Sequence, residues 1–250
     1  MSAGRVAELE HEVAGLREQL AGSRRESDER RAQLERYAAD LRDTYAQERK
    51  RAAELQASYI ATARALSNAV EARDAYTGKH AERVAAYGLA VADAVGLTLT
   101  DEPEMELGFL LHDVGKVAIP DSILFKPEPL ADHERALMVR HPVIGWEILR
   151  DVEFLGEARR VVRSHHERWD GDGYPDGLAG DDIPLSARVF AVADTLDALT
   201  TTRPYRTATS FSDARRVIED EAGGQFDPDV VDAFTRVADA RFAELRATVG

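Results

Sequence analysis

Residues 109–117 read FLLHDVGKV and place three ionisable side chains inside an apolar run. The three are His112, Asp113 and, three residues later, Lys116. A buried charge needs a partner, and an imidazole beside a carboxylate offers donor atoms to one or two cations. The alternative is an Asp113–Lys116 ion pair on a surface turn, but the segment is too apolar for a solvated face. The pattern therefore favours a buried metal site on a helix.

The rest of the chain supplies further histidines but no cysteine. Without cysteine there is no disulfide, thiolate zinc site or iron–sulfur cluster, so a metal site must use imidazole and carboxylate ligands. Each histidine taken singly would more often be a hydrogen-bonded structural residue than a ligand. Taken together, five of them in or beside predicted helices favour ligation: His80, His112, His141, His165 and His166. His11 and His133 are assigned to no site.

Two of these histidines open the segment HHERWDGDGYP at residues 165–175. Adjacent imidazoles at a helix end can ligate two neighbouring metals. The glycine-rich turn that follows ends in Tyr174 and Pro175, and taken alone it is an ordinary connector.

Composition limits the partners. The chain has 250 residues, 44% of them hydrophobic, and 32 basic against 46 acidic residues give a net charge of −14. This charge disfavours nucleic acid and anionic membrane surfaces, and no stretch approaches 18 uncharged apolar residues. Charged residues among the first twenty fit no secretory signal, so we expect a cytoplasmic protein without membrane insertion.

The first part of the chain carries a heptad pattern. Its apolar residues alternate in steps of three and four, which defines positions a and d of a coiled coil. They are Val6, Leu9, Val13, Leu16, Leu20, Leu34, Tyr37, Leu41 and Leu55, with a polar gap at Ser23, Ser27 and Arg30. We predict that residues 5–57 form a parallel homodimeric coiled coil. The alternative is one amphipathic helix folded back on its own core.

From residue 58 onward the apolar pattern widens and predicts an all-α domain over residues 58–250. The expected helices cover residues 60–70, 84–97, 105–117, 133–149, 155–166, 187–199, 211–221 and 228–245. Thr100, followed by Asp101 and Glu102, is expected to start one helix, and Ser210 with Asp213 resembles a capping box. The predicted fold class is an all-α helical bundle preceded by a long coiled-coil helix.

The ordered motifs of this domain resemble the HD-GYP family, the bacterial branch of HD-type metal-dependent phosphohydrolases that degrade cyclic diguanylate. The resemblance runs from about residue 58 to the end of the chain. Its motifs are EARDAYT at 71–77 leading to His80, HDVGK at 112–116 followed by Ile119-Pro120, HPVIG at 141–145, the segment 165–175, VAD at 192–194 leading to RPYR at 203–206, and GQFDP at 224–228.

The resemblance implies the roles of individual residues. It implies that the metal ligands are His80, His112, Asp113, His141, His165, His166 and Asp194, with Asp113 as the bridge. It implies that Lys116 contacts the substrate phosphate and assists catalysis, and that Tyr174, Arg203 and Arg206 line the substrate pocket. Family members with a third metal have a glutamate where this chain has Tyr76, so we expect two divalent ions, iron or manganese in preference to zinc.

The implied activity is metal-dependent hydrolysis of cyclic diguanylate to linear diguanylate or guanylate. One alternative is a receptor that binds the dinucleotide and reports it to a partner without useful turnover. Another is a phosphodiesterase for a different cyclic dinucleotide. The chain shows no recognisable sensory domain, so we expect an input signal to arrive through the coiled coil or from a signalling partner protein.

Overall fold

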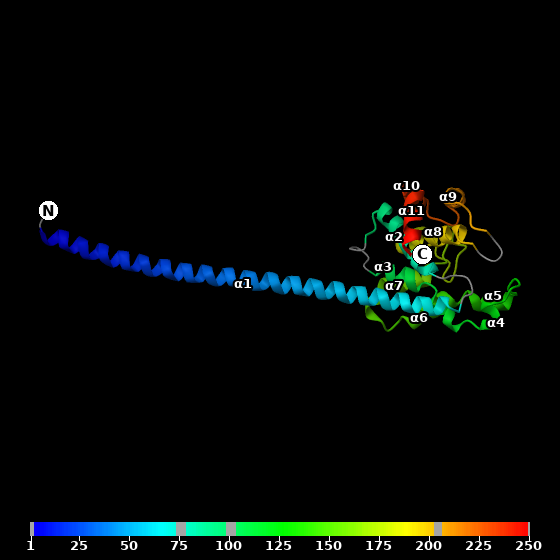
Figure 1. The fold of residues 1–250 in the computed structure, drawn as a ribbon, viewed down its shortest axis with the longest axis horizontal. Coiled ribbons are helices and arrows are strands. Elements are labelled where there is room, and N and C mark those ends of the chain that lie inside the picture. The colour runs from blue at the N-terminus through cyan, green and yellow to red at the C-terminus, as the bar shows by residue number, and fades with distance from the viewer. Residues whose placement is uncertain (1–2, 74–78, 99–103, 203–206, 250) are drawn as a thin grey trace. The chain divides into compact units, whose positions relative to one another are not determined.

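The computed structural model describes residues 3–73, 79–98, 104–202 and 207–249. Within these ranges the chain is helical and contains no β-strand, only an isolated bridge between Ala222 and Phe226. The all-α prediction is confirmed (Figure 1). The helices are α1 Ala3–Glu71, α2 His80–Val95, α3 Met105–Leu111, η1 Val114–Ala118, α4 Asp121–Leu124, α5 Asp132–Met138, α6 His141–Ile148, η2 Glu153–Leu155, α7 Gly156–Ser164, η3 Gly180–Asp182, α8 Leu185–Thr200, α9 Phe211–Asp220, α10 Pro228–Arg236 and α11 Asp239–Val249.

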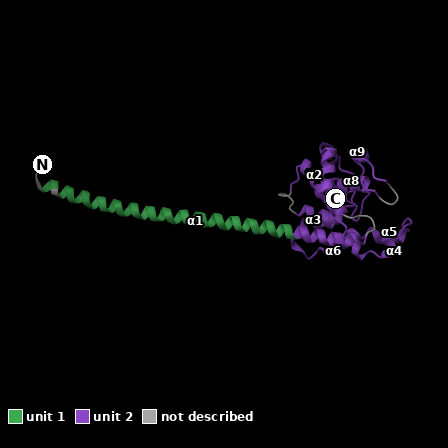
Figure 2. Ribbon diagram, in the orientation of Figure 1, with its two compact units in different colours: residues 1–58 green, residues 59–250 purple. Residues whose placement is uncertain are grey.

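The chain forms two compact units, residues 1–58 and residues 59–250 (Figure 2). The first unit consists of the N-terminal part of α1, and its heptad leucines are 42–70% exposed. No helix among the described residues is both long enough and apolar enough to cross a membrane.

The second unit has a single core in which α2 packs on α8 and α3 packs on α7. Aromatic side chains fill much of it: Tyr87, Phe109, Phe190, Phe234 and Phe242 are completely buried. Tyr87 meets the Phe242 ring edge-on at 5.6 Å between centroids, which is a favourable aromatic geometry. This core fixes α2 and α8, the two longest helices within the unit and the carriers of His80 and Asp194.

The prediction of one helix over residues 105–117 is wrong for the second half of this range. The α-helix ends at Leu111, and residues 114–118 form the 3₁₀ helix η1. Gly115 explains the tight path of η1, because a Cβ atom there would lie 1.9 Å from the carbonyl oxygen of His141. The close approach of η1 to α6 therefore needs glycine at this position.

The single helix expected over residues 133–149 is also wrong, since α5 ends at Met138 and α6 begins at His141. Pro142 has no backbone N–H with which to continue the helical ladder to the carbonyl of Met138. The ring of His141 takes that carbonyl instead, with 2.9 Å between Nδ1 and the oxygen. The break thus orients a predicted metal ligand.

The helix expected over residues 228–245 is divided at Val237, which has an extended backbone. The guanidinium of Arg215 donates to the carbonyl oxygens of Phe234 and Val237 and so pairs the helix end from outside. The predicted cap at Ser210 is confirmed, because its hydroxyl oxygen accepts from the amide of Asp213 at 3.0 Å. The cap expected at Thr100 lies outside the described residues.

Candidate metal centre

Three buried histidines share one orientation. The Nδ1 atoms of His112, His141 and His165 each lie 2.8–2.9 Å from the carbonyl oxygen three residues earlier in the chain. A carbonyl oxygen only accepts, so each Nδ1 carries the hydrogen and each neutral ring leaves a lone pair on Nε2. Local helix geometry therefore presents three Nε2 atoms as ligands.

The Nε2 atoms of His141 and His165 lie 3.1 Å apart. With both Nδ1 atoms protonated, two lone pairs face one another at this distance. Such a contact is favourable only when a proton or a metal ion lies between or beside the two atoms. His166 completes this trio, whose ligand atoms lie within 4.8 Å of one another. We call His141, His165 and His166 the His141 group.

A second trio consists of His80, His112 and Asp113, again with ligand atoms within 4.8 Å of one another. We call it the His80 group. Asp113 faces both groups, because its Oδ2 lies 3.0 Å from Nε2 of His112 and its Oδ1 lies 3.3 Å from Nε2 of His141. One carboxylate thus faces imidazoles of both groups, as expected of a bridging ligand.

The charge of Asp113 is strongly favoured. Burial alone would raise its pKa, but attraction to the Lys116 ammonium holds the pKa well below its usual range. Nζ of Lys116 lies 2.7 Å from Oδ2. The Asp113–Lys116 ion pair considered as a surface alternative does form, but it lies inside the site.

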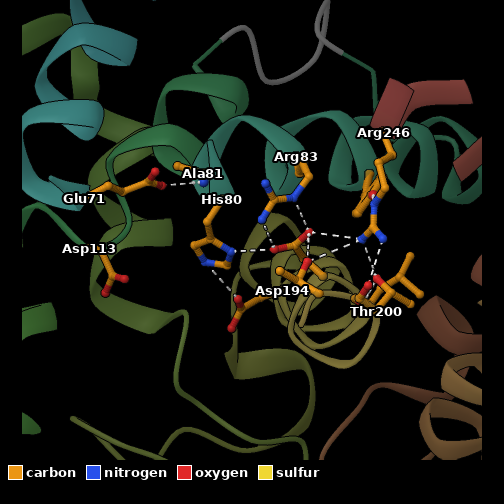
Figure 3. A network of polar contacts seen from close by, with 12 residues as sticks. Glu71, His80, Ala81, Arg83, Asp113, Asp194, Thr200 and Arg246 are labelled. Carbon is orange, nitrogen blue, oxygen red and sulfur yellow. Dashed lines mark hydrogen bonds and ion pairs between the residues drawn. The ribbon is translucent and has the colours of Figure 1, made fainter. Parts of the chain in front are cut away.

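His80 lies between two aspartates of α8 (Figure 3). Its Nε2 lies 3.3 Å from Oδ1 of Asp194, and its Nδ1 lies 2.8 Å from Oδ2 of Asp197. Burial opposes protonation of the ring, but hydrogen bonding to the two carboxylates outweighs it and raises the pKa of His80 to about 10. A cation that binds Nε2 must displace that proton.

The His141 group is electrostatically different. Burial, reinforced by the neighbouring His141, lowers the pKa of His166 to about 4. Burial likewise holds the pKa of His165 well below its usual value, with His166 contributing. These two rings are neutral at physiological pH and need no deprotonation before they bind a metal.

The residues present therefore fit a metal centre. The donor set is imidazole and carboxylate, the rings are held by their Nδ1 hydrogen bonds, and unprotonated Nε2 atoms converge. Nitrogen and oxygen donors of this kind suit divalent ions such as iron, manganese or zinc. The arrangement allows metal binding by both groups around Asp113.

The sequence model of the HD domain family matches residues 64–230. The chain belongs to the HD domain family. The resemblance to the HD-GYP branch that the motifs indicate is confirmed by curated relatives of high identity.

Two curated relatives are named for different cyclic dinucleotides. A cyclic di-GMP phosphodiesterase response regulator of Xanthomonas campestris, RpfG, is 43% identical over 173 residues, which cover 68% of this chain and 46% of the relative. A 3'3'-cGAMP-specific phosphodiesterase 2 of Vibrio cholerae is 41% identical over 186 residues, which cover 74% of this chain and 35% of the relative. The chain thus matches less than half the length of either relative.

A solved structure shares the fold. The cyclic GMP-AMP specific phosphodiesterase V-cGAP3 of V. cholerae superposes with a TM-score of 0.57 at 20% identity, covering 74% of this chain and 51% of that one. At this identity the similarity supports the HD fold alone.

The HD domain brings most of the predicted site residues together. All seven proposed ligands are described and lie in one connected set of side chains: His80, His112, Asp113, His141, His165, His166 and Asp194. Lys116 pairs with Asp113, and the ring of Tyr174 stacks on His166 at 4.7 Å between centroids. Arg203, Arg206 and Tyr76 lie outside the described residues.

Asp197 belongs to the candidate site, although the sequence motifs did not indicate it. Its carboxylate is 1% exposed, accepts from His80 and from Nε of Arg83 at 2.7 Å, and lies 3.6 Å from the guanidinium of Arg246. Burial would raise the pKa of Asp197, but hydrogen bonding from His80 and Arg83 lowers it to about 2. It is an anion that orients the ring of His80, a proposed metal ligand. The spacing of three residues from Asp194 to Asp197, which places both on one face of a helix, was the available signal.

Glu167 is a second residue that was missed. It is 4% exposed and accepts from the amides of Asp176 and Leu178 at 2.8 and 3.0 Å. These bonds tie the turn carrying Tyr174 to the end of α7. Gly173 serves the same turn, since a Cβ there would lie 2.4 Å from the amide nitrogen of Arg168. Glutamate next to paired histidines gave no signal of its own.

Proposed function

We propose that this HD domain is a metal-dependent phosphodiesterase that hydrolyses cyclic diguanylate. The observation that carries the proposal is Asp113, which faces imidazoles of both ligand groups and lies beside the ammonium of Lys116. The names of relatives at 39–43% identity, cyclic di-GMP phosphodiesterases, support the substrate class.

The proposed ligands are the seven residues named above, and the proposed cofactors are two divalent ions, iron or manganese in preference to zinc. When bound, such ions supply Lewis acidity that neutralises phosphodiester charge and lowers the pKa of the attacking water. Asp113 remains ionised because its pKa is held low, so it is ready to ligate over the physiological pH range. His112, His141 and His165 keep their Nε2 lone pairs directed at the site through their carbonyl bonds.

Two further side chains act on the substrate. Lys116 places a positive charge beside Asp113, where it can bind a non-bridging phosphate oxygen more tightly as charge develops. Burial, with the charge of Asp113 contributing, raises the pKa of Tyr174 to about 12, so the phenol stays protonated and donates a hydrogen bond. We propose Arg203 and Arg206 as additional phosphate contacts, on the strength of the RPYR motif and the fit of guanidinium to phosphate.

The reaction consumes one water for each ester bond broken. Attack on phosphorus releases the ribose 3′-oxygen, which leaves as a hydroxyl, and gives linear diguanylate. A second hydrolysis gives two molecules of guanylate. We propose the first reaction as the minimum activity of this chain.

The test is hydrolysis by the full chain, purified without oxygen and loaded separately with iron(II), manganese(II) and zinc(II). The substrates are cyclic diguanylate, 3'3'-cGAMP and cyclic diadenylate, with chromatographic product analysis and metal counting. We expect turnover of cyclic diguanylate with two ions per chain. Preferred turnover of 3'3'-cGAMP would reassign the substrate, and three ions per chain would refute the expectation drawn from Tyr76. Tight binding without turnover would favour the receptor alternative.

We also propose that residues 5–57 form a parallel homodimeric coiled coil that joins two copies of an HD domain at 58–250. The boundary between the two compact units, at residues 58 and 59, supports this division. The exposed heptad leucines form a stripe that a second copy of the same helix can bury.

Charges flanking the stripe support a parallel, in-register pair. In such a pair, position g of one helix faces position e of the next heptad on its partner. Three of these pairs join opposite charges and, within residues 5–57, none joins like charges. The complementary pairs are Arg5 with Glu10, Glu12 with Arg17, and Glu26 with Arg31 of opposite helices.

Light scattering on the full chain tests the dimer. Wild-type protein is expected to be dimeric at micromolar concentration, and the double variant Leu16→Glu with Leu20→Glu is expected to be monomeric. His11→Glu, a change at the outward f position, is the control and is expected to leave the dimer intact. A monomeric wild type would refute the proposal.

A further inference from the structure

The last residue of α1 contacts the first turn of α2. The carboxylate Oε1 of Glu71 accepts from the amide of Ala81 at 2.6 Å (Figure 3). Ala81 directly follows His80, the first residue of α2. The first amides of a helix have no acceptor within the helix, and a negative charge is favourable at this end. Glu71 therefore fixes the start of α2 at the residue next to a proposed metal ligand.

Glu71 also lies within electrostatic reach of the site. Burial of the carboxyl raises its pKa overall, and the hydrogen bond from the Ala81 amide and attraction to the His80 ring oppose this rise. Its Oε2 atom is buried and meets no hydrogen-bond donor among the residues that the structure describes. Plain helix capping does not require so costly a group, because an exposed serine or asparagine side chain would serve.

Two residues after Glu71, Arg73 hydrogen-bonds to the segment that follows Lys116. Its Nη1 donates to the carbonyl oxygen of Val117 at 2.7 Å, and its Nη2 donates to Ile119 at 3.3 Å and to Oδ1 of Asp121 at 2.6 Å. The amide of Ile119 in turn donates to the carbonyl of Lys116. The planar guanidinium fork thus holds the end of η1, the element that presents Lys116.

We infer that Glu71 and Arg73 are positioning residues, Glu71 for the metal ligand His80 and Arg73 for the phosphate contact Lys116. The inference rests on the proposed function for the role of Lys116, and for Glu71 only on the proposed ligand set. The end of α1 therefore positions two parts of the site. Glu71 acts on metal affinity through His80, and Arg73 acts on substrate binding through Lys116.

Arg64 provides a matched control. It lies two helical turns before Glu71 on the same helix and pairs with Glu82 of α2 at 3.5 Å and with Glu106 of α3 at 3.6 Å. It therefore ties α1 to neighbouring helices as Glu71 does, and neither Glu82 nor Glu106 is a proposed site residue. Arg64→Ala measures what a loss of helix docking does by itself.

The experiment compares Glu71→Ala, Glu71→Gln, Arg73→Ala and Arg64→Ala in the full chain. Manganese affinity is measured by competition with a chelator, hydrogen exchange is followed at residues 80–84 and 114–119, and KM and kcat are measured at saturating metal. Glutamine keeps the acceptor for the Ala81 amide, so Glu71→Gln is the rescue variant. Melting temperatures are measured alongside to follow folding.

We expect Glu71→Ala to weaken binding of one metal ion about 10-fold, which is the lower end for loss of a group that orients a ligand. Its exchange should rise at residues 80–84, and Glu71→Gln should restore both properties. Arg73→Ala should retain both metal ions, raise exchange at residues 114–119 and raise KM. Arg64→Ala should change neither metal affinity nor KM.

The inference is overturned if Glu71→Ala binds metal like Arg64→Ala, or if Arg73→Ala leaves KM and exchange unchanged. It is also overturned if Glu71→Gln, folded as judged by its melting temperature, fails to restore metal affinity. An inactive wild-type chain would refute the proposed function alone, because metal affinity and exchange still report on both residues.

Discussion

The imidazole of His80 and the imidazoles of the His141 group are proposed ligands of one type, but they are held in opposite ways. Burial opposes protonation of His80, but the carboxylates of Asp194 and Asp197 accept hydrogen bonds from its ring and raise its pKa to about 10. Two rings of the His141 group are held instead by the backbone carbonyls of Met138 and Val162. In that group burial lowers the pKa of His166 to about 4.

The difference shows that histidine ligands of one site can differ in whether a proton must leave before a metal ion binds. A metal ion entering the His80 group competes with a strongly held proton, whereas His165 and His166 of the His141 group are already neutral. Asp113 faces both groups and couples them. Four predictions test this contrast, beginning with the change that should affect both groups.

Asp113→Ala removes the carboxylate that lies between the groups. Both lose an oxygen donor, and Lys116 loses its ion-pair partner. We expect the two metal ions to be lost or weakly bound and turnover to fall by at least about a thousandfold. Metal counting and single-turnover assays measure both effects. Full metal content with normal turnover would contradict the bridging role.

The pH dependence of metal binding separates the groups directly. Below a pKa of about 10, His80 holds a proton that the metal must displace, so affinity of the His80 group should rise about 10-fold per pH unit. The total expected gain from pH 6 to pH 8 is therefore about 100-fold. His165 and His166 should add no such dependence, because burial holds their pKa values low, that of His166 at about 4.

Stepwise manganese titration at fixed pH values, with the chelator corrected for its own protonation, measures this dependence. If the affinities of the two metal ions changed equally with pH, the proposed difference between the two groups would be refuted.

Asp197→Asn perturbs the His80 group alone. The amide retains the shape of the side chain but loses the charge that supports protonated His80 and Arg83. We expect affinity for one metal ion to fall about 10- to 100-fold while the second ion is unaffected. Asp181→Asn is the control, because that aspartate also pairs with an arginine but is 91% exposed. Loss of both ions in equal measure would show that Asp197 supports the whole fold instead.

Tyr174→Phe tests the substrate side of the His141 group. The ring stack on His166 is retained and only the hydroxyl is lost. We expect unchanged metal content and an increase in KM of about 5-fold, equivalent to one hydrogen bond of about 1 kcal/mol. Steady-state kinetics at saturating metal measure it. A loss of metal in this variant would show that the hydroxyl supports the ligands instead of the substrate.

Much of this site could be predicted from the chain alone because its residues occur in short, ordered motifs. The doublet at His112 and Asp113 and the pair at His165 and His166 are local signals. Asp197 and Glu167 escaped because their roles depend on partners far away: Asp197 contacts His80 across 117 positions of sequence. Glu71 and Arg73 escaped for the same reason.

Helix boundaries, too, were predicted only where they depend on local sequence. Hydrophobic periodicity predicted helices over 133–149 and 228–245, but it does not register a missing amide or a side chain that takes a carbonyl. Pro142 and the ring of His141 divide the first, and Arg215 pairs the carbonyls at the division of the second. These breaks place side chains that a continuous helix would point elsewhere.

The sequence by itself determined the helical class, the heptad stripe and the family, because each is written in residue spacing over one or a few turns. Only the tertiary structure decided that Asp113 faces two ligand groups and that their protonation differs. Both depend on burial and on charges brought together from distant segments. A pKa is set by those surroundings, and no local pattern contains them.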